Sequence, residues 1–163
     1  MVESVNEMPR RALVRRRGEA PVLRVGAEML GFTFTGAETG GACGLIERVV
    51  SPGFQSPPDA HRHTSEDWLC HLLDGRLVFQ LDGEVEEMTP GDSLFVPRGV
   101  HFRWWNPEQA PARALFLYIP GGFEQFFADV AEAVTPKADR IHDYDRTLAD
   151  IHALHDRYGI VRA

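Results

Sequence analysis

The feature that most constrains the fold is a series of short β-favouring runs separated by turn signals. These runs fall at residues 30–34, 43–50, 68–72, 76–81, 93–96, 102–105 and 114–119. Asp-Gly at 74–75 and at 82–83 predicts two hairpin turns, and Pro-Gly at 52–53 and 90–91 marks further turns. Strands spaced this regularly are typical of an all-β sandwich or barrel.

The end of the chain has a different pattern. From Phe123 to Val134, and again from Tyr144 to Tyr158, apolar residues recur at helical spacing, and Gly159 follows as a C-terminal stop. We therefore predict an all-β fold with two C-terminal α-helices. The predicted segments are a flexible basic stretch at residues 1–27, a β-barrel at 28–122 and a helical segment at 123–163 that packs on the barrel.

Length and composition limit the classes of partner. A chain of 163 residues can bury the core of one domain, and a second domain is not expected. The net charge of -7 opposes a nucleic-acid partner, because phosphate binding needs clustered Lys and Arg. No run approaches the roughly 18 apolar residues of a membrane span. Cys43 and Cys70 form no CxxC motif and follow no secretory signal, so we expect a cytoplasmic protein without disulfides.

The stretch HRHTSEDWLCHLLDG, residues 61–75, carries the first candidate chemistry. His61 and His63 lie two apart in an extended segment, and alternation points both side chains to the same face. Histidine nitrogen is a common ligand of zinc, iron, nickel and copper, so the two imidazoles could share one ion. Paired histidines also occur as exposed loop residues, and the HxH pattern alone does not separate the two interpretations.

Two motifs resemble those of the cupin family, and within it the single-domain quercetin dioxygenase-like proteins. The family's first motif reads G-x5-H-x-H-x(3–4)-E-x6-G and is matched here by His61, His63 and Gly75. The second reads G-x5-P-x-G-x2-H-x3-N and is matched by Gly91, Pro97, Gly99 and Asn106. The resemblance covers about residues 28–160. It implies a cupin-type antiparallel β-barrel, or jelly roll, that acts on small molecules, and it implies a homodimer.

The sequence departs from these motifs at two positions that the resemblance assigns to metal ligands. Trp68 stands where the family has its glutamate, and Phe102 stands where it has its second-motif histidine. Asp67 and His101 are each one residue away, and a one-residue slip on a strand turns a side chain to the opposite face. Recruiting Asp67 would require a bulge, and recruiting His101 would require a shortened loop after Gly99.

The aromatic replacements predict a pocket rather than a metal centre. A barrel interior that carries His61, His63, Trp68, Phe102 and Trp104 would be mainly apolar with polar groups at one side, which is the usual composition of a small-molecule site. Flat aromatic walls suit flat or polycyclic ligands. The alternative is that the aromatic side chains fill the barrel and leave no cavity.

Other polar residues have simpler interpretations. Glu66 and Asp67 are most simply solvated, although one of them could orient a neighbouring imidazole. His71 shares its strand face with Leu69 and Leu73, which favours a packing or dimer-interface role. His152 and His155 fit a solvated or packed helix face.

Three functions remain open. We favour an enzyme without a firmly bound cofactor, in which His61 or His63 transfers a proton during cyclisation, isomerisation or dehydration of a hydrophobic, aromatic or polyketide-like molecule. The first alternative is a quercetinase-like dioxygenase that depends on iron, nickel, manganese or zinc and recruits Asp67 or His101. The second is a non-catalytic small-molecule-binding cupin. Fold alone does not choose among them.

Overall fold

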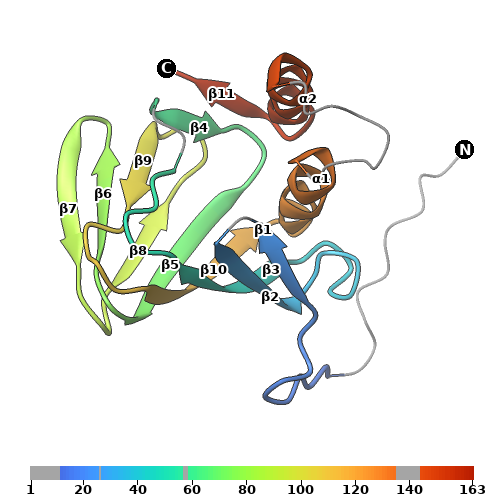
Figure 1. Ribbon diagram of the computed structural model, residues 1–163. Helices are drawn as coiled ribbons and strands as arrows, with labels where there is room; N and C mark the ends of the chain where they lie inside the picture. Colours follow the sequence, from blue (N-terminus) through green and yellow to red (C-terminus); the bar gives the residue numbers. More distant parts are fainter. Residues whose placement is uncertain (1–11, 26, 57–58, 135–143) are drawn as a thin grey trace, which may run out of the picture.

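Two antiparallel β-sheets face one another, and two helices lie beside the open edge between them (Figure 1). The computed structural model describes residues 12–25, 27–56, 59–134 and 144–163. Within these residues, one sheet contains, in spatial order, β1 (Val22–Val25), β2 (Glu28–Phe34), β3 (Gly44–Val50), β10 (Ala112–Ile119), β5 (Asp67–Asp74) and β8 (Ser93–Val96). The other contains β11 (Ile160–Arg162), β4 (His61–His63), β9 (Phe102–Trp105), β6 (Leu77–Leu81) and β7 (Glu84–Met88). This arrangement, with its C-terminal helices, confirms the predicted fold class.

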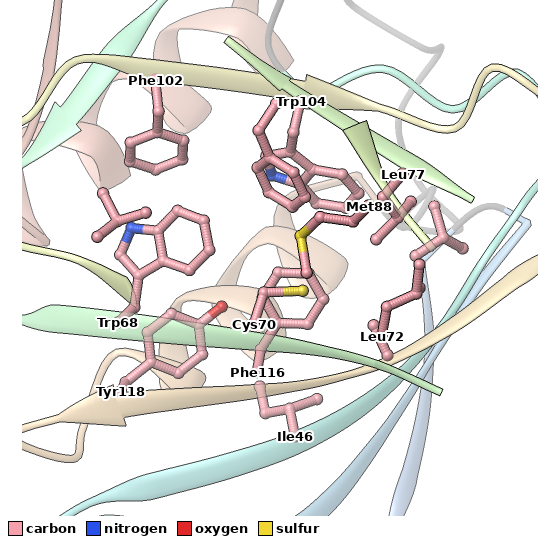
Figure 2. Close-up of a cluster of buried hydrophobic side chains, with 14 of the residues drawn as sticks. Ile46, Trp68, Cys70, Leu72, Leu77, Met88, Phe102, Trp104, Phe116 and Tyr118 are labelled. Atoms are coloured by element: carbon pink, nitrogen blue, oxygen red, sulfur yellow. The ribbon is translucent and has the colours of Figure 1, made fainter. Parts of the chain in front are cut away.

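The core lies between the two sheets and follows from strand alternation. In β3, β5 and β10, every second side chain is buried, so each strand presents one mainly apolar face to the interior. Figure 2 shows how side chains from the two sheets meet in this space. Trp68 and Cys70 project from β5, Phe116 and Tyr118 from β10, and Trp104 from β9 on the opposite side. Burial of these faces holds the barrel together.

Four strands were not among the predicted runs: β1, β4, β7 and β11. Strand β1 lies in the segment expected to be flexible, and it pairs with β2 through Val22 and Gly31. Strand β7 reads EVEEM and is exposed except at Met88, so it lacks the apolar alternation that marks a strand in a sequence. Residues 1–11 and 26 of the predicted flexible stretch lie outside the described residues, and the division into three segments stays a prediction.

The two helices occupy the stretches where helical spacing was seen, as α1 (Glu124–Val134) and α2 (Tyr144–Arg157). Glu124, the first residue of α1, is buried, and its carboxylate accepts hydrogen bonds from the backbone N–H of Gly36 at 2.5 Å and of Gly122 at 2.8 Å. An acidic side chain in the first turn also suits the helix dipole. These contacts fix the start of α1 against the sheet. None of the described helices is both long and apolar enough to cross a membrane.

The last strand places the C-terminal end of the chain beside the histidines. Gly159 ends the turn after α2 with a φ of 66°, in the left-handed region that glycine adopts readily. Strand β11 then pairs with β4, so that Ile160 lies opposite His63 and Arg162 opposite His61. Strand β4 is therefore held between β11 and β9.

Candidate functional site

A cavity of about 270 Å³ lies between the sheets and extends beneath the helices. The cavity favours the predicted pocket over the alternative of a solidly packed barrel. Its walls include all the residues that the sequence singled out for the pocket, namely His61, His63, Trp68, Phe102 and Trp104. Helix α1 adds Phe126, Phe127 and Val130, and α2 adds Ile151 and His155.

The two histidines face this cavity from β4. Both His61 and His63 are 5% exposed, and their ring centroids are 5.6 Å apart. The ring of His63 also lies 4.3 Å from that of Phe123. In the part of the chain that the structure describes, neither Nδ1 atom has a hydrogen bond of standard geometry. The β4 alternation therefore delivers both imidazoles to the interior, as predicted, while their catalytic roles stay predictions.

Burial changes the ionisation of the first histidine. The pKa of His61 is lowered from 6.5 to about 3, mainly because burial desolvates the imidazolium, and the neighbouring His63 and His155 add to the effect. His61 is therefore a neutral imidazole at neutral pH. A group with so low a pKa can donate or accept a hydrogen bond, but it is a weak base.

Glu66 is the site residue whose position differs most from expectation. It is 4% exposed rather than solvated, and its Oε1 lies 2.6 Å from Nδ1 of His63. Neither of these two atoms has a hydrogen bond of standard geometry, so the carboxylate is within reach of the imidazole without being aligned with it. Such a carboxylate can orient an imidazole and favour one tautomer. The orienting role considered for Glu66 or Asp67 thus fits Glu66.

Asp67 and His101 do not join the histidines. Asp67 accepts hydrogen bonds from the backbone N–H of Arg98 at 2.8 Å and from its Nε at 3.0 Å. The Nδ1 of His101 lies 3.8 Å from Asp82, and the side chain is partly exposed. Each is therefore occupied away from the cavity, in agreement with the strand alternation that turns both away from the inner face.

The donor set does not fit a metal centre of the usual kind. A stable zinc-like site needs at least three protein donors. Among the described residues, no group of three or more His, Cys, Asp or Glu side chains could hold a metal ion. Trp68 and Phe102 are buried, with ring centroids 4.7 Å apart, and Phe102 lies 4.4 Å from His61. Aromatic rings, rather than further metal donors, therefore lie beside the histidines.

Aromatic rings form much of the remaining wall. Trp68 stacks on Phe116 at 6.0 Å, and Trp104 lies 5.4 Å from the same ring. The indole Nε1 of Trp68 is buried without a hydrogen-bond partner in the described part of the chain. The pocket thus combines flat apolar walls with a few unpaired polar atoms, an arrangement that suits a planar ligand with polar substituents.

Sequence reasoning missed a buried ion pair in the same wall. Arg48 on β3 and Glu28 on β2 both line the cavity, with Nη2 of the arginine 3.2 Å from Oε2 of the glutamate. The signal was present in the strand alternation, because Arg48 has the same parity as the buried Ile46 and Val50. His155 was expected on a helix face, and it is packed there but also borders the cavity.

Fold and site together define an antiparallel β-barrel protein of the jelly-roll class with a ligand-sized internal cavity. Residues 47–118 match the family model described as the cupin domain. This match to a cupin model supports the resemblance seen in the two motifs.

Two curated relatives are similar in sequence. Over 82 residues the chain is 34% identical to the tetracenomycin polyketide synthase protein TcmJ of Streptomyces glaucescens, covering 50% of this chain and 52% of the relative. Over 157 residues it is 25% identical to quercetin 2,3-dioxygenase of Bacillus subtilis strain 168, covering 92% of this chain and 45% of that protein. The chain spans about half the length of the curated relatives that it matches.

Solved structures show the same fold. KdgF from Halomonas sp. superposes with a TM-score of 0.62 at 16% identity and covers 71% of this chain and 99% of its own. A predicted oxalate decarboxylase from Thermotoga maritima gives a TM-score of 0.60 at 19% identity, covering 66% and 99%. The nucleoside dehydratase Pac13 of Streptomyces gives 0.55 at 13% identity, covering 71% and 88%. At these identities the likeness establishes the fold alone.

Proposed function

We propose that the protein is a small-molecule enzyme that performs acid–base chemistry on a hydrophobic, aromatic or polyketide-like substrate bound in the cavity. The observation that carries this proposal is the approach of the Glu66 carboxylate to Nδ1 of His63 at 2.6 Å, where His63 itself lines a largely apolar pocket. An imidazole oriented by a carboxylate is a common arrangement for proton transfer.

Each of the three polar residues has its own role in this proposal. A carboxylate at Nδ1 favours the tautomer that carries its proton there, which leaves Nε2 of His63 as the basic nitrogen. His63 takes or returns the proton, and Glu66 orients the ring. His61 stays neutral because its pKa is about 3, and it hydrogen-bonds to the substrate or to the reacting oxygen.

The size and the aromatic lining of the cavity favour a flat substrate. A volume of about 270 Å³ is close to the lower end of ligand pockets, so the cavity suits a molecule of a few fused rings rather than a large ligand. Each well-placed aromatic contact would contribute roughly 0.5–1.5 kcal/mol. The two curated relatives bear names that refer to a polyketide synthase and to quercetin, which agrees with a planar, oxygen-rich substrate.

The proposal includes no firmly bound metal. A quercetinase-like dioxygenase would need a third donor, and the two candidates, Asp67 and His101, are held by Arg98 and beside Asp82. Moving either one inward would require a one-residue slip of β5 or β9, which would also turn Trp68 or Phe102 out of the core.

Products distinguish the proposed chemistry from dioxygenation. The purified protein would be incubated with a panel of hydroxylated naphthalenes, naphthoquinones and linear polyketide mimics, and products would be measured by mass spectrometry. Cyclisation or isomerisation leaves the mass unchanged and dehydration removes one water, whereas a dioxygenase adds two oxygen atoms. We expect His63→Ala and Glu66→Gln to suppress turnover and the matched variant His101→Ala to retain it. Oxygen incorporation, or full activity in His63→Ala, would refute the proposal.

We also propose that the protein is cytoplasmic and that it forms a homodimer. Cys43 and Cys70 are both free thiols, which agrees with a reducing compartment. Gel filtration with light scattering would establish the oligomeric state.

A further inference from the structure

Arg48 is a charged side chain at an unusual position, inside the aromatic part of the cavity. It is 6% exposed and lines the cavity from β3. Its guanidinium carbon lies 4.9 Å from the ring centroid of Trp104, 5.1 Å from Phe127, 5.3 Å from Phe116 and 5.4 Å from Phe54. Contacts of this kind with the faces of aromatic rings are attractive for a cation and hold the guanidinium in the wall.

The hydrogen bonds of Arg48 are incomplete, whereas those of its partner are not. Glu28 Oε2 accepts from Nη2 of Arg48 at 3.2 Å, and Oε1 accepts from the backbone N–H and the hydroxyl of Ser51, both at 2.7 Å. A guanidinium has five N–H donors. Among the described residues Nε of Arg48 has no partner, although it is buried. Buried donors without an acceptor are costly, so this group calls for an acceptor from a ligand or from water.

The guanidinium and the histidines occupy different parts of the same wall. Arg48 contacts Trp104 and Phe116, whereas His61 and His63 contact Phe102. Trp68 lies between these groups, because its ring touches both Phe102 and Phe116. A flat molecule that lies along Trp68 would thus meet imidazoles at one end and donors at the other.

We propose that Arg48 is a specificity residue that binds an acceptor oxygen, of a ketone or a carboxylate, on a planar aromatic ligand. This inference rests on the ligand pocket of the proposed function but not on its proton chemistry. Glu28 positions the guanidinium, since its own oxygens are occupied by Ser51 and Arg48. The aromatic rings then select the flat body of the ligand, and the N–H donors of the guanidinium select its oxygen.

Two near-isosteric probes test the proposal directly. Equilibrium dialysis of the full chain would measure the dissociation constants of 2-acetonaphthone, which carries a carbonyl oxygen, and of 2-ethylnaphthalene, which does not. We expect the ketone to bind about tenfold more tightly or better, because a hydrogen bond from a charged donor contributes roughly that factor. A third probe, 2-naphthoate, separates the two acceptors: tighter binding than the ketone indicates a carboxylate, and weaker binding indicates a ketone.

Substitutions test whether the preference for the ketone over the hydrocarbon comes from the guanidinium of Arg48. Arg48→Met should remove the preference for the ketone while the hydrocarbon still binds, and Arg48→Lys should retain part of it. His63→Ala should keep the preference for the ketone, so full turnover in this variant with an intact preference would refute the proton chemistry and not the Arg48 site. Equal binding of the two probes by the unmodified protein would overturn the proposal, even if Arg48→Met fails to fold. A preference that survives in folded Arg48→Met would also overturn it.

Discussion

His61 on β4 lies directly opposite Phe102 on β9, and their ring centroids are 4.4 Å apart. Phe102 occupies the position where the second cupin motif has a histidine. Trp68, at the position of the glutamate in the first motif, lies 4.7 Å from the same phenyl ring. Two aromatic side chains thus stand together where the motifs imply two metal ligands, and the histidine pair faces them.

Restoring the two motif residues should create a metal site. In the double variant Trp68→Glu/Phe102→His, a carboxylate and a third imidazole would join His61 and His63. We expect calorimetric titration with Ni²⁺ or Zn²⁺ to show binding at least ~10-fold tighter than in the unmodified chain. The variant Asp67→Asn, which keeps Trp68 and Phe102, serves as the control. It should bind metal as weakly as the unmodified protein. Loss of metal binding in Asp67→Asn would show instead that Asp67 is a ligand.

Trp68 should contribute to ligand binding beyond its contribution to folding. Phe79 is a matched control, because it is also fully buried and packs 6.1 Å from Trp68, but it is not part of the cavity wall. We expect Trp68→Leu and Phe79→Leu each to lower the free energy of unfolding by about 1–4 kcal/mol in urea titrations. Only Trp68→Leu should weaken the binding of 2-acetonaphthone, with a severalfold higher dissociation constant. Equal affinities in the two variants would mean that Trp68 is purely a core residue.

Stability should fall at acidic pH because of His61. Its pKa is about 3 in the folded protein and ordinarily 6.5, so between these values the unfolded state binds more protons. The free energy of unfolding therefore decreases as the pH falls below 6.5, by about 2 kcal/mol from this group between about pH 7 and pH 5. The lowered pKa of His155 acts in the same direction.

The variant His61→Leu should show a shallower decrease over that interval. Chemical unfolding at the two pH values measures it, with His101→Leu as a control for loss of a partly exposed histidine. If both variants keep the full pH dependence of the unmodified protein, His61 is not the group responsible.

The strands that carry the site could be predicted because their sequence alternates. In β9, Phe102 and Trp104 are buried and Arg103 is exposed, as the apolar pattern required. The same reasoning placed His61 and His63 on the inner face. Strand β7 could not be found in this way, since most of its side chains are exposed and its place is set by pairing with β6.

The polar partners in the pocket were harder to predict, for two different reasons. Glu66 lies in the turn between β4 and β5, where no periodicity applies, and only the three-dimensional path of the chain brings it to His63. Arg48 did follow strand alternation, but an arginine is ordinarily expected at the surface. Its burial depends on Glu28 from the neighbouring strand and on rings from distant parts of the chain.

We propose that His61 and His63 line the ligand pocket as metal-free imidazoles. Elemental analysis of protein expressed in medium that contains iron, nickel, manganese and zinc tests this claim most directly. We expect clearly less than one ion per chain and an unfolding midpoint that a chelator leaves nearly unchanged. One tightly held ion per chain, lost on substitution of His61 or His63 together with Asp67 or His101, would contradict it.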